Sequence, residues 1–320
     1  MTEESTPTIK PKENFDPEFA AKRFKISMKG LGTDEAMIIN MLVSHSSLQR
    51  QEIEEKYKAM YGRDLLEDLK DELGGHFENA VVAMLSSPYA VLVWALHSAL
   101  SGVGTEETIL TEILCCRTAE ELEGISWFYE QQTGKTLDEA LAEDLSGDFR
   151  DLMRGLVAGG RDDDGGPTDS ATARKDAQDL YDAGIGMNAA TDESEFIRIL
   201  NNRSFVQLKA TFDEYENVSQ ETIEDSIDKE FSGDIKNGLL AIVRRVRDPL
   251  AFFADRIHIS MAGMGTDDKG LIRLLVSRSE IDLGSIKARY KELYSTELYD
   301  DVKSDTSGDY QKLLLAIVGK

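Results

Sequence analysis

Apolar residues recur along the chain three and four residues apart, which is the spacing of one face of an α-helix. In four places such a column follows a Thr-Asp or Thr-Glu pair: Ile38, Met41 and Leu42; Leu110, Ile113 and Leu114; Phe196, Ile199 and Leu200; Leu271, Leu274 and Leu275. Four later columns have the same spacing: Val81, Met84 and Leu85; Met153, Leu156 and Val157; Leu239, Ile242 and Val243; Leu314, Ile317 and Val318. No stretch shows sustained alternation with period two, so the pattern predicts an all-α fold.

Two kinds of residue mark where these helices are expected to begin. Threonine is a favourable N-cap, and the acids behind it suit the positive end of the helix dipole. The threonines before the first four columns, Thr33, Thr105, Thr191 and Thr266, are therefore expected to cap helices. Proline fits the first position of a helix, and Asp16-Pro17, Ser87-Pro88 and Asp248-Pro249 predict three further helix starts.

The chain contains four copies of one unit. The four threonines are separated by 72, 86 and 75 residues. A second marker, an acid before a glycine-containing turn, recurs with the same separations at Glu72, Asp144, Glu230 and Asp305. Two independent markers in one register predict an internal repeat, with each unit built from several helices.

The longer middle interval contains a stretch, residues 159–167, that is rich in glycine and acids and is unsuited to a helix. We interpret it as a linker and divide the chain at about residue 165, with two repeats on each side. The expected segments are an N-terminal tail over 1–14, repeats over 15–86 and 87–158, a linker over 159–170, and repeats over 171–246 and 247–320.

Composition excludes several classes of protein. With 36 basic and 60 acidic residues the formal charge is −24, which argues against electrostatic binding of nucleic acid. The longest wholly apolar run, residues 90–96, has seven residues, whereas a membrane-spanning helix needs about 18 or more. The first residues lack a positive region and an apolar core, so no secretory signal is expected. Cys115 and Cys116 are adjacent and are expected to be buried thiols.

The glycine-rich loops before the threonines are candidates for a metal site. Gly30, Gly102 and Gly263 each precede the late acid of their unit by 42 residues. Paired glycines let successive carbonyls point to one side, and several carbonyls with one carboxylate suit Ca²⁺. The alternative is structural: the glycine ends one helix, and the acid is a solvated cap of another.

Together these features resemble the annexin family: the Lys-Gly-Leu-Gly-Thr loop at residue 29, the distant acid, and four units of about 70 residues over 15–320. The resemblance implies four repeats of about five helices each in a slightly curved disc, with Ca²⁺ loops on its convex face. It also implies Ca²⁺ ligands in three units: Met28, Gly30, Gly32 and Glu72; Leu100, Gly102, Gly104 and Asp144; Met261, Gly263, Gly265 and Asp305. A weaker secondary site maps to Thr33 and Glu35.

The third unit departs from this pattern. Asn188 and Ala190 replace the two loop glycines opposite Glu230, and Met187 replaces the lysine. Alanine adopts the left-handed conformation poorly, so the loop carbonyls are expected to point elsewhere. A Ca²⁺ site in the third unit is left open.

The resemblance implies a cytoplasmic protein without catalytic activity that binds anionic phospholipid membranes, with phosphatidylserine-like headgroups, reversibly through Ca²⁺. It would be peripheral on membranes when Ca²⁺ rises, with room for self-association there and for a protein partner of the tail; no nucleic acid is expected. The alternative is an α-helical repeat scaffold that binds proteins without obligate Ca²⁺. An enzyme is disfavoured, because no nucleophile is paired with a base at any motif spacing.

Overall fold

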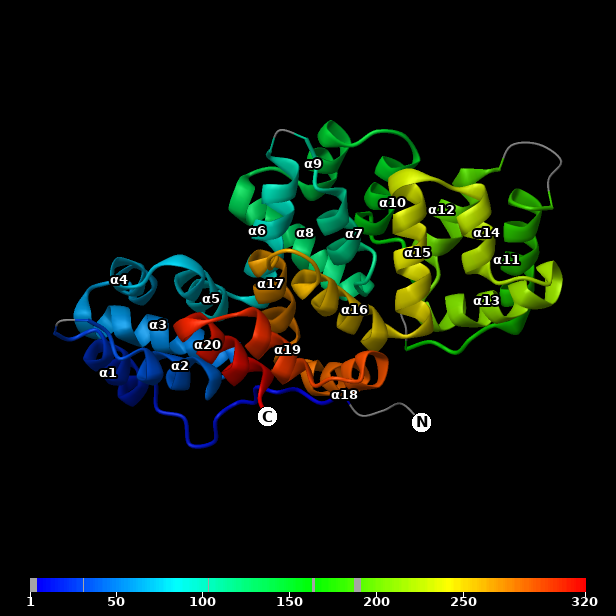
Figure 1. Cartoon of the computed structure of the whole chain (residues 1–320). Coiled ribbons are helices and arrows are strands. Elements are labelled where there is room, and N and C mark those ends of the chain that lie inside the picture. The colour runs from blue at the N-terminus through cyan, green and yellow to red at the C-terminus, as the bar shows by residue number, and fades with distance from the viewer. Residues whose placement is uncertain (1–4, 31, 103, 163–164, 187–190) are drawn as a thin grey trace. The chain divides into compact units, whose positions relative to one another are not determined.

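The computed structural model describes residues 5–30, 32–102, 104–162, 165–186 and 191–320, and twenty α-helices form over this part of the chain. No strand occurs in the described ranges, which confirms the all-α prediction. Each repeat contributes five helices in chain order (Figure 1). Within the described ranges, every helix is too short or too polar to span a lipid bilayer.

The helices divide into two compact units that do not follow the linear division at residue 165. Unit 1 comprises Met1–Val91 and Phe253–Lys320, and unit 2 comprises Leu92–Phe252. The first repeat is therefore packed with the fourth, and the second with the third. The linker is a break in the sequence pattern, but it lies inside unit 2 and does not separate two units.

Unit 1 is built from the first and last groups of helices, and the boundaries with unit 2 fall within the helices over residues 88–100 and 249–261. The two groups are α1 (Pro17–Ser27), α2 (Glu35–Val43), α3 (Ser47–Tyr61), α4 (Leu65–Glu72) and α5 (Gly75–Leu85), then α16 (Pro249–Met261), α17 (Asp268–Arg278), α18 (Leu283–Tyr294), α19 (Leu298–Asp305) and α20 (Gly308–Val318). The guanidinium of Arg50, only 2% exposed, pairs with Glu280 at 2.9 Å. The same carboxylate accepts the backbone N–H of Ser47 at 2.7 Å, so one ion pair joins the first repeat to the fourth.

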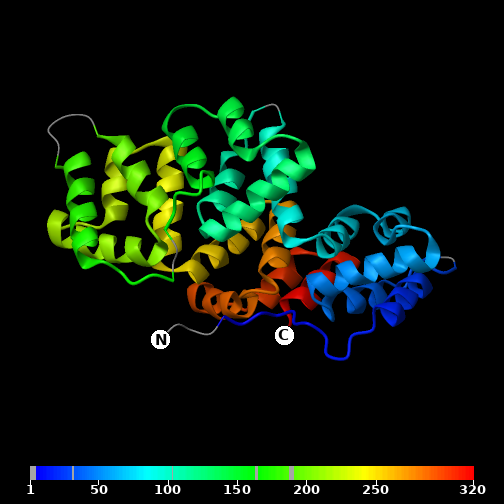
Figure 2. The ribbon, with the colours of Figure 1, turned by 180° about the vertical axis from the view of Figure 1, so that it is seen from behind.

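The described N-terminal residues form an extended segment that belongs to unit 1. Their backbone runs along the start of α18, as both ribbon views show (Figures 1 and 2). The N–H groups of Thr8 and Ile9 donate to Ser279 O at 2.8 and 3.0 Å, and Gly284 N–H donates to Thr6 O at 2.7 Å. Ile9 is buried beside these bonds, which anchor the segment.

Unit 2 is built from the two middle groups of helices. These are α6 (Pro88–Leu100), α7 (Glu107–Leu114), α8 (Ala119–Thr133), α9 (Leu137–Asp144) and α10 (Gly147–Val157), then α11 (Ser170–Ala183), α12 (Glu193–Asn202), α13 (Phe205–Ser219), α14 (Ile223–Glu230) and α15 (Gly233–Arg247). Arg245 Nε donates to Cys116 O at 3.1 Å, and Asn201 Nδ2 donates to Leu152 O at 3.1 Å. Both bonds join the second repeat to the third. The two thiols are buried as expected, and burial raises the pKa of Cys115.

The predicted helix starts are partly right. Pro17, Pro88 and Pro249 are the first residues of α1, α6 and α16, as the sequence predicts. The threonines, however, are not N-caps. The cap of α2, α7, α12 and α17 is the following acid: Asp34, Glu106, Asp192 and Asp267. Three of these acids accept a backbone N–H of the first turn, which leaves the threonine hydroxyl for another partner.

Candidate metal loops

Each glycine-rich loop is closed at its base by one backbone hydrogen bond. In the first, second and fourth repeats the N–H of the helix-capping acid donates to the carbonyl seven residues earlier: Asp34 to Ser27, Glu106 to Ala99 and Asp267 to Ser260, at 2.8 to 3.2 Å. In the third repeat Asp192 donates to Ala183 at 2.8 Å, nine residues earlier. The third loop is therefore two residues longer than the others.

The spacing between the loop and its acid does not reveal this extra length. The distance from Asn188 to Glu230 is also 42 residues, because the two additional residues lie at the start of the loop and before this interval. The start of the loop is itself rearranged, since Gly184 donates to Leu180 O and Tyr181 O, and Gly186 donates to Tyr181 O at 2.8 Å. Met187, Asn188 and Ala190 lie outside the described residues.

The loop glycines of the first and fourth repeats have the conformation that the sequence predicts. Gly30 and Gly32 have φ of 114° and 86°, and Gly263 and Gly265 have φ of 103° and 96°. Side chains rarely adopt such values, and an added Cβ at any of these four would meet only open space. Glycine is needed here for backbone conformation and not for close packing. The preceding Met28 is the C-cap of α1, and Met261 is the last residue of α16.

The second repeat differs at the first of its two glycines. Gly104 has φ of 88°, but Gly102 lies outside the left-handed region. An added Cβ at Gly102 would make ordinary contact, 3.6 Å from Gly104 O. Leu100, the remaining backbone position of the expected set, is the last residue of α6. This loop therefore shares one of the two left-handed glycines with the loops of the first and fourth repeats.

The late acid occupies one structural position in all four repeats. Glu72, Asp144, Glu230 and Asp305 are the last residues of α4, α9, α14 and α19. The next residue is extended, and the glycine three residues after the acid has φ between 60° and 66° in every repeat. That glycine is the first residue of the following helix. Because it recurs in all four repeats, an alignment of the repeats could have identified it as a structural position.

A threonine hydroxyl connects three of the loops to their acids. Thr105 Oγ1 donates to Asp144 at 2.5 Å and Thr266 Oγ1 donates to Asp305 at 2.6 Å, and Thr191 donates to Glu230 in the same way. Because each threonine ends its loop, this bond brings the loop and the distant carboxylate together. The sequence pattern does not reveal this role, because a threonine before a helical column also fits a helix cap.

In the first repeat the threonine has a different partner. Thr33 Oγ1 donates to Glu35 Oε1 at 2.7 Å, so the two residues of the expected secondary site lie in contact. Thr33, Glu35 and Glu72 line one cavity of about 360 Å³, together with His76 and Asp309. The structure therefore brings the first loop and its acid to one place without the threonine–acid bond.

Ca²⁺ requires several oxygen ligands, which can be carboxylates or carbonyls. Among the described residues, no group of three or more His, Cys, Asp or Glu side chains could hold a metal ion. A set with one carboxylate and several carbonyls is the alternative way to bind a hard cation, and it needs glycines of the observed conformation. Both loop glycines have this conformation in the first and fourth repeats, and one of the two has it in the second.

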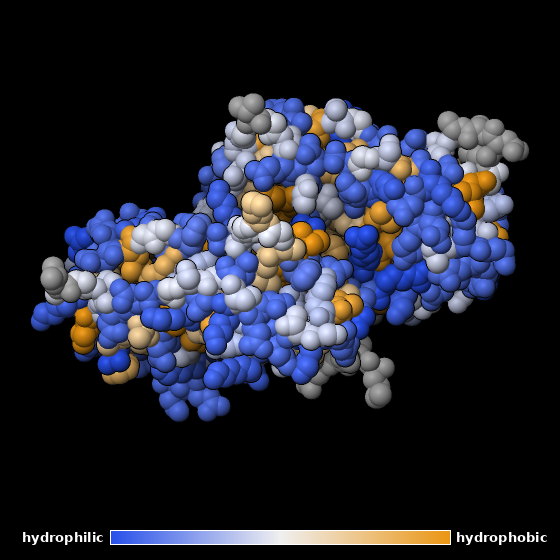
Figure 3. Space-filling model, viewed as in Figure 1, coloured by the Kyte–Doolittle hydropathy of each residue, from blue (hydrophilic) through white to orange (hydrophobic). Residues whose placement is uncertain are grey.

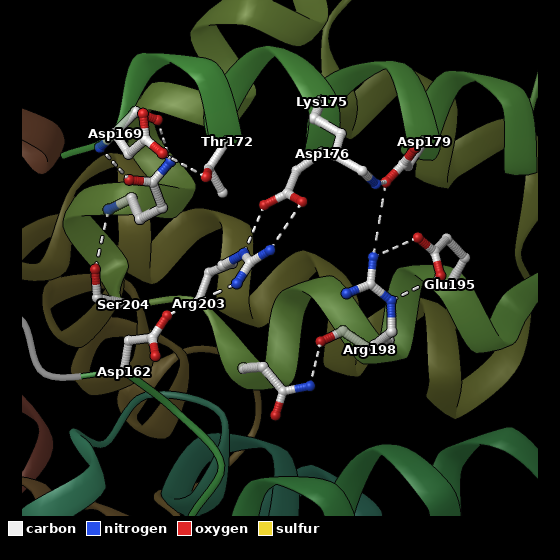
Figure 4. Close-up of polar contacts among 12 residues, drawn as sticks. Asp162, Asp169, Thr172, Lys175, Asp176, Asp179, Glu195, Arg198, Arg203 and Ser204 are labelled. Atoms are coloured by element: carbon white, nitrogen blue, oxygen red, sulfur yellow. Dashed lines mark hydrogen bonds and ion pairs between the residues drawn. The ribbon is translucent and has the colours of Figure 1, made fainter.

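The helices beside the third loop are ordered by ion pairs, as Figure 4 shows. Arg203 holds Asp176 with two bonds of 2.6 and 3.1 Å, and Arg198 pairs with Glu195 at 2.8 Å. Hydrogen bonding to Asp176 raises the pKa of Arg203, although burial opposes the shift. The third repeat therefore keeps five helices around its longer loop.

Comparison with known proteins gives one family for the whole chain. The annexin family model matches residues 18–84, 93–156, 175–242 and 252–317, one match per repeat. Annexin A4 of Homo sapiens is 46% identical over 312 residues, covering 98% of this chain and 97% of that relative. Annexin B10 of Drosophila melanogaster is 43% identical over 320 residues, covering 100% and 99%.

Solved structures agree. The structure of annexin III superimposes with a TM-score of 0.96 at 44% identity, covering 98% of this chain and 97% of the other. A calcium-bound annexin, (Sm)1, gives a TM-score of 0.90 at 33% identity, covering 99% and 94%. These matches confirm the four repeats and the resemblance seen in the sequence. The chain therefore belongs to the annexin family, whose proteins bind phospholipids in a Ca²⁺-dependent manner and are not enzymes.

Proposed function

We propose that this chain binds anionic phospholipid membranes reversibly through Ca²⁺ ions held by the loops of its first, second and fourth repeats. The ligands would be the carbonyls of Met28, Gly30 and Gly32 with the Glu72 carboxylate, those of Leu100, Gly102 and Gly104 with Asp144, and those of Met261, Gly263 and Gly265 with Asp305. Thr33 and Glu35 would form the secondary site. Calcium in the (Sm)1 relative supports the choice of ion.

The observation that carries the proposal is the left-handed conformation of both loop glycines in the first and fourth repeats, 42 residues before an acid that ends a helix. The two features come from separate parts of each repeat. A loop that only ended a helix would need one left-handed residue, so the second glycine favours a ligand-binding role over a structural one.

Electrostatics explains why such a protein needs a cation at the membrane. A chain with a formal charge of −24 is repelled by an anionic leaflet. Bound Ca²⁺ would supply positive charge and open coordination positions for lipid phosphate or carboxylate oxygens. Each loop offers one carboxylate, so its affinity without lipid is expected to be weak, about 10⁻⁴ M or weaker. Lipid and Ca²⁺ then raise each other's affinity equally.

The third repeat is left out of the proposed sites. Glu230 has the same helix-end position as the other acids and the same threonine bond as Asp144 and Asp305, but its loop is two residues longer and starts differently. As part of this proposal, the protein is cytoplasmic and becomes peripheral on membranes when Ca²⁺ rises. The protein would prefer phosphatidylserine-like headgroups. Self-association on the membrane and a protein partner of the N-terminal tail are compatible with this function.

The direct test is sedimentation with phosphatidylserine vesicles, with Ca²⁺, without it, and after addition of a chelator. We expect binding only with Ca²⁺ and full release by the chelator. Binding that ignores Ca²⁺ would favour the protein scaffold instead. Binding that survives chelation would indicate insertion into the bilayer and would contradict a Ca²⁺ bridge.

A further inference from the structure

A groove in the second repeat carries chemistry that the Ca²⁺ loops do not use. It lies between α8, the start of α9 and the chain that follows α10, and it encloses about 960 Å³. Four of its lining residues, Glu120, Glu123, Trp127 and Glu130, are spaced three, four and three residues apart on α8. This spacing places them on one face of the helix, over a length of about 15 Å.

The face combines an exposed aromatic ring with carboxylates. Arg161 also lines the groove, but it is 6% exposed and its guanidinium donates to the carbonyls of Arg203 and Leu200. The side chain of Trp127 is 59% exposed, whereas tryptophan side chains are on average largely buried in folded proteins. In the described structure, no ion pair involves Glu120, Glu123 or Glu130, whereas Asp138 nearby is held by Arg154 at 2.7 Å. An aromatic face beside carboxylates favours a cation, because both attract positive charge.

The groove also contains a buried polar atom that requires a partner. Ser126 lines it, and its Oγ is buried without a hydrogen bond among the described atoms. A buried hydroxyl without a partner costs free energy, and rotation of the Ser126 side chain into the groove would let a polar occupant supply the missing bond.

The internal repeat indicates what shape of ligand fits. Aligning Arg278 with Arg117 places α18 of the fourth repeat in register with α8, with Leu283, Ile286 and Tyr290 opposite Leu122, Ile125 and Tyr129. In unit 1 an extended segment of the chain, residues 5–9, crosses the start of α18. The residues that correspond to its contacts at Ser279, Ile281 and Gly284 are Thr118, Glu120 and Glu123, which line one end of the groove. An extended peptide is therefore the shape of ligand that the repeat suggests.

Recognition in the groove must differ from that of the N-terminal segment. In unit 1, Gly284 allows the close approach of Thr6 O, whereas the corresponding residue in α8 is Glu123. At the N-terminus of α8 a capping box already engages the backbone N–H groups of Thr118 and Glu121. Side-chain charge would therefore replace the backbone contacts.

We propose that this groove binds an extended, arginine-containing segment of a partner protein. A guanidinium stacks on an indole face and forms paired hydrogen bonds with a carboxylate, which a lysine ammonium does less well. The acids that flank Trp127 on α8 would take the other cationic side chains of the segment. This interaction needs neither Ca²⁺ nor lipid, so it is independent of the proposed membrane function.

Trp127 itself reports on the groove, because the chain contains only one other tryptophan, Trp94. The full-length Trp94→Phe variant would be titrated in chelator, at low ionic strength, with a short acetylated peptide of alternating arginine and serine. We expect a saturable change in tryptophan fluorescence that weakens as salt is raised. The same peptide with citrulline in place of arginine is the neutral control and should bind far more weakly.

Charge removal tests the site. In the Trp94→Phe background, Glu123→Gln with Glu130→Gln should weaken peptide binding by about three- to tenfold. The matched control, Glu52→Gln with Glu55→Gln, removes two exposed charges from α3, the corresponding helix of the first repeat, and should leave affinity unchanged. Circular dichroism would establish that each variant is folded.

Three results would overturn the proposal. The first is the absence of a saturable change with the arginine peptide. The second is equal weakening by the control pair, which would mean that the overall charge attracts the peptide. The third is equally tight binding of citrulline peptide or of a linear polyamine, since neither requires a site for an arginine-containing segment.

Discussion

The carboxylates at the ends of α4, α9, α14 and α19 share one position but face different loops, and this allows a matched set of substitutions. Glu72→Gln, Asp144→Asn and Asp305→Asn should each raise the Ca²⁺ concentration for half-maximal vesicle binding, by roughly threefold or more. Glu230→Gln should change it little. Each of the first three removes the only full negative charge of a proposed site. Vesicle titration with Ca²⁺ measures the effect.

Glu230→Gln is a close control for this series because it weakens the same threonine–acid bond as Asp305→Asn, by removing the charge of the acceptor. A loss that depended only on that bond would appear in both variants. An equal loss from both would contradict the omission of the third repeat, and no loss from any of the four would remove the Ca²⁺ bridge altogether.

Asp68 shows how a buried charge contributes to the stability of unit 1. It is 6% exposed and accepts hydrogen bonds from Tyr57 at 2.5 Å, from Lys25 at 3.2 Å and from Arg63. Burial alone would raise the pKa of Asp68, but these three donors outweigh it and lower the pKa below 3.8. The lowered pKa stabilises the folded state above about pH 4, and this contribution is lost as the pH falls through the folded pKa.

We therefore expect Asp68→Asn to reduce the free energy of unfolding at neutral pH by about 1–3 kcal/mol, the cost of leaving buried donors unsatisfied. Thermal denaturation from neutral pH to about pH 3 would measure it. The difference between the two proteins should shrink below about pH 4, where the Asp68 carboxyl begins to be protonated in the unfolded chain while the native one is still charged. A difference that stayed constant across this range would show that the charge of Asp68 contributes nothing.

At the scale of one element, the loops differ in how much their backbone needs glycine. Gly263→Ala places a side chain at φ of 103°, which should lower stability in chelator by about 1–2 kcal/mol. Gly102→Ala should be neutral or slightly stabilising, because Gly102 is not left-handed and its Cβ has room. Melting temperatures without Ca²⁺ would test both. Equal destabilisation by the two would mean that the second loop has the conformation of the fourth.

The N-terminal segment is the element held most directly by a single glycine. A Cβ on Gly284 would lie 2.6 Å from Thr6 O, a backbone atom that cannot rotate away. Gly284→Ala should therefore displace residues 5–9 and speed hydrogen exchange of the Thr8 and Ile9 amides by roughly tenfold, the loss of about one hydrogen bond. Ser285→Ala, which removes only the acceptor of Thr6 N–H, should have a smaller effect. Unchanged exchange in Gly284→Ala would mean that the segment is held from elsewhere.

For the whole molecule, weak sites predict a modest response to Ca²⁺ alone. With a dissociation constant of about 10⁻⁴ M, about 1 mM Ca²⁺ stabilises each occupied site by about 1.4 kcal/mol, and about 1 µM stabilises it negligibly. The melting temperature should rise by only a few degrees at millimolar Ca²⁺. Differential scanning calorimetry would check this. A rise of tens of degrees at micromolar Ca²⁺ would mean tight, preformed sites and would refute the argument from ligand charge.

The sites also act together at this scale. Because several loops would bind one membrane at once, the loss of a second site lowers the effective concentration for those that remain. The double variant Glu72→Gln with Asp305→Asn should therefore weaken vesicle binding more than either single variant. A double variant no weaker than the singles would show that the loops do not bind the same surface together.

The sequence alone determined those features of this protein that depend on nearby residues. Helical periodicity, and the proline residues that begin helices, depend on residues within one or two turns of each other. The apolar columns from Ile38 to Val318 therefore predicted an all-α chain of four repeats. The paired loop glycines and the acids after them recur at fixed spacing, so the candidate ligands were also available. The prediction that the threonines are caps was wrong because the acid after each threonine is the cap. In three repeats the threonine hydroxyl donates instead to a carboxylate 39 residues away.

Only the tertiary structure decided the features that depend on residues far apart in the chain. The pairing of the first repeat with the fourth rests on contacts such as Arg50 with Glu280, 230 residues apart, which no local pattern encodes. The two additional residues of the third loop lie outside the repeated 42-residue interval. Only the backbone hydrogen bond from Asp192 to Ala183, which closes the loop, reveals them. The groove beside Trp127 likewise exists only once α8, α9 and the chain after α10 have packed, since its walls come from three separate segments.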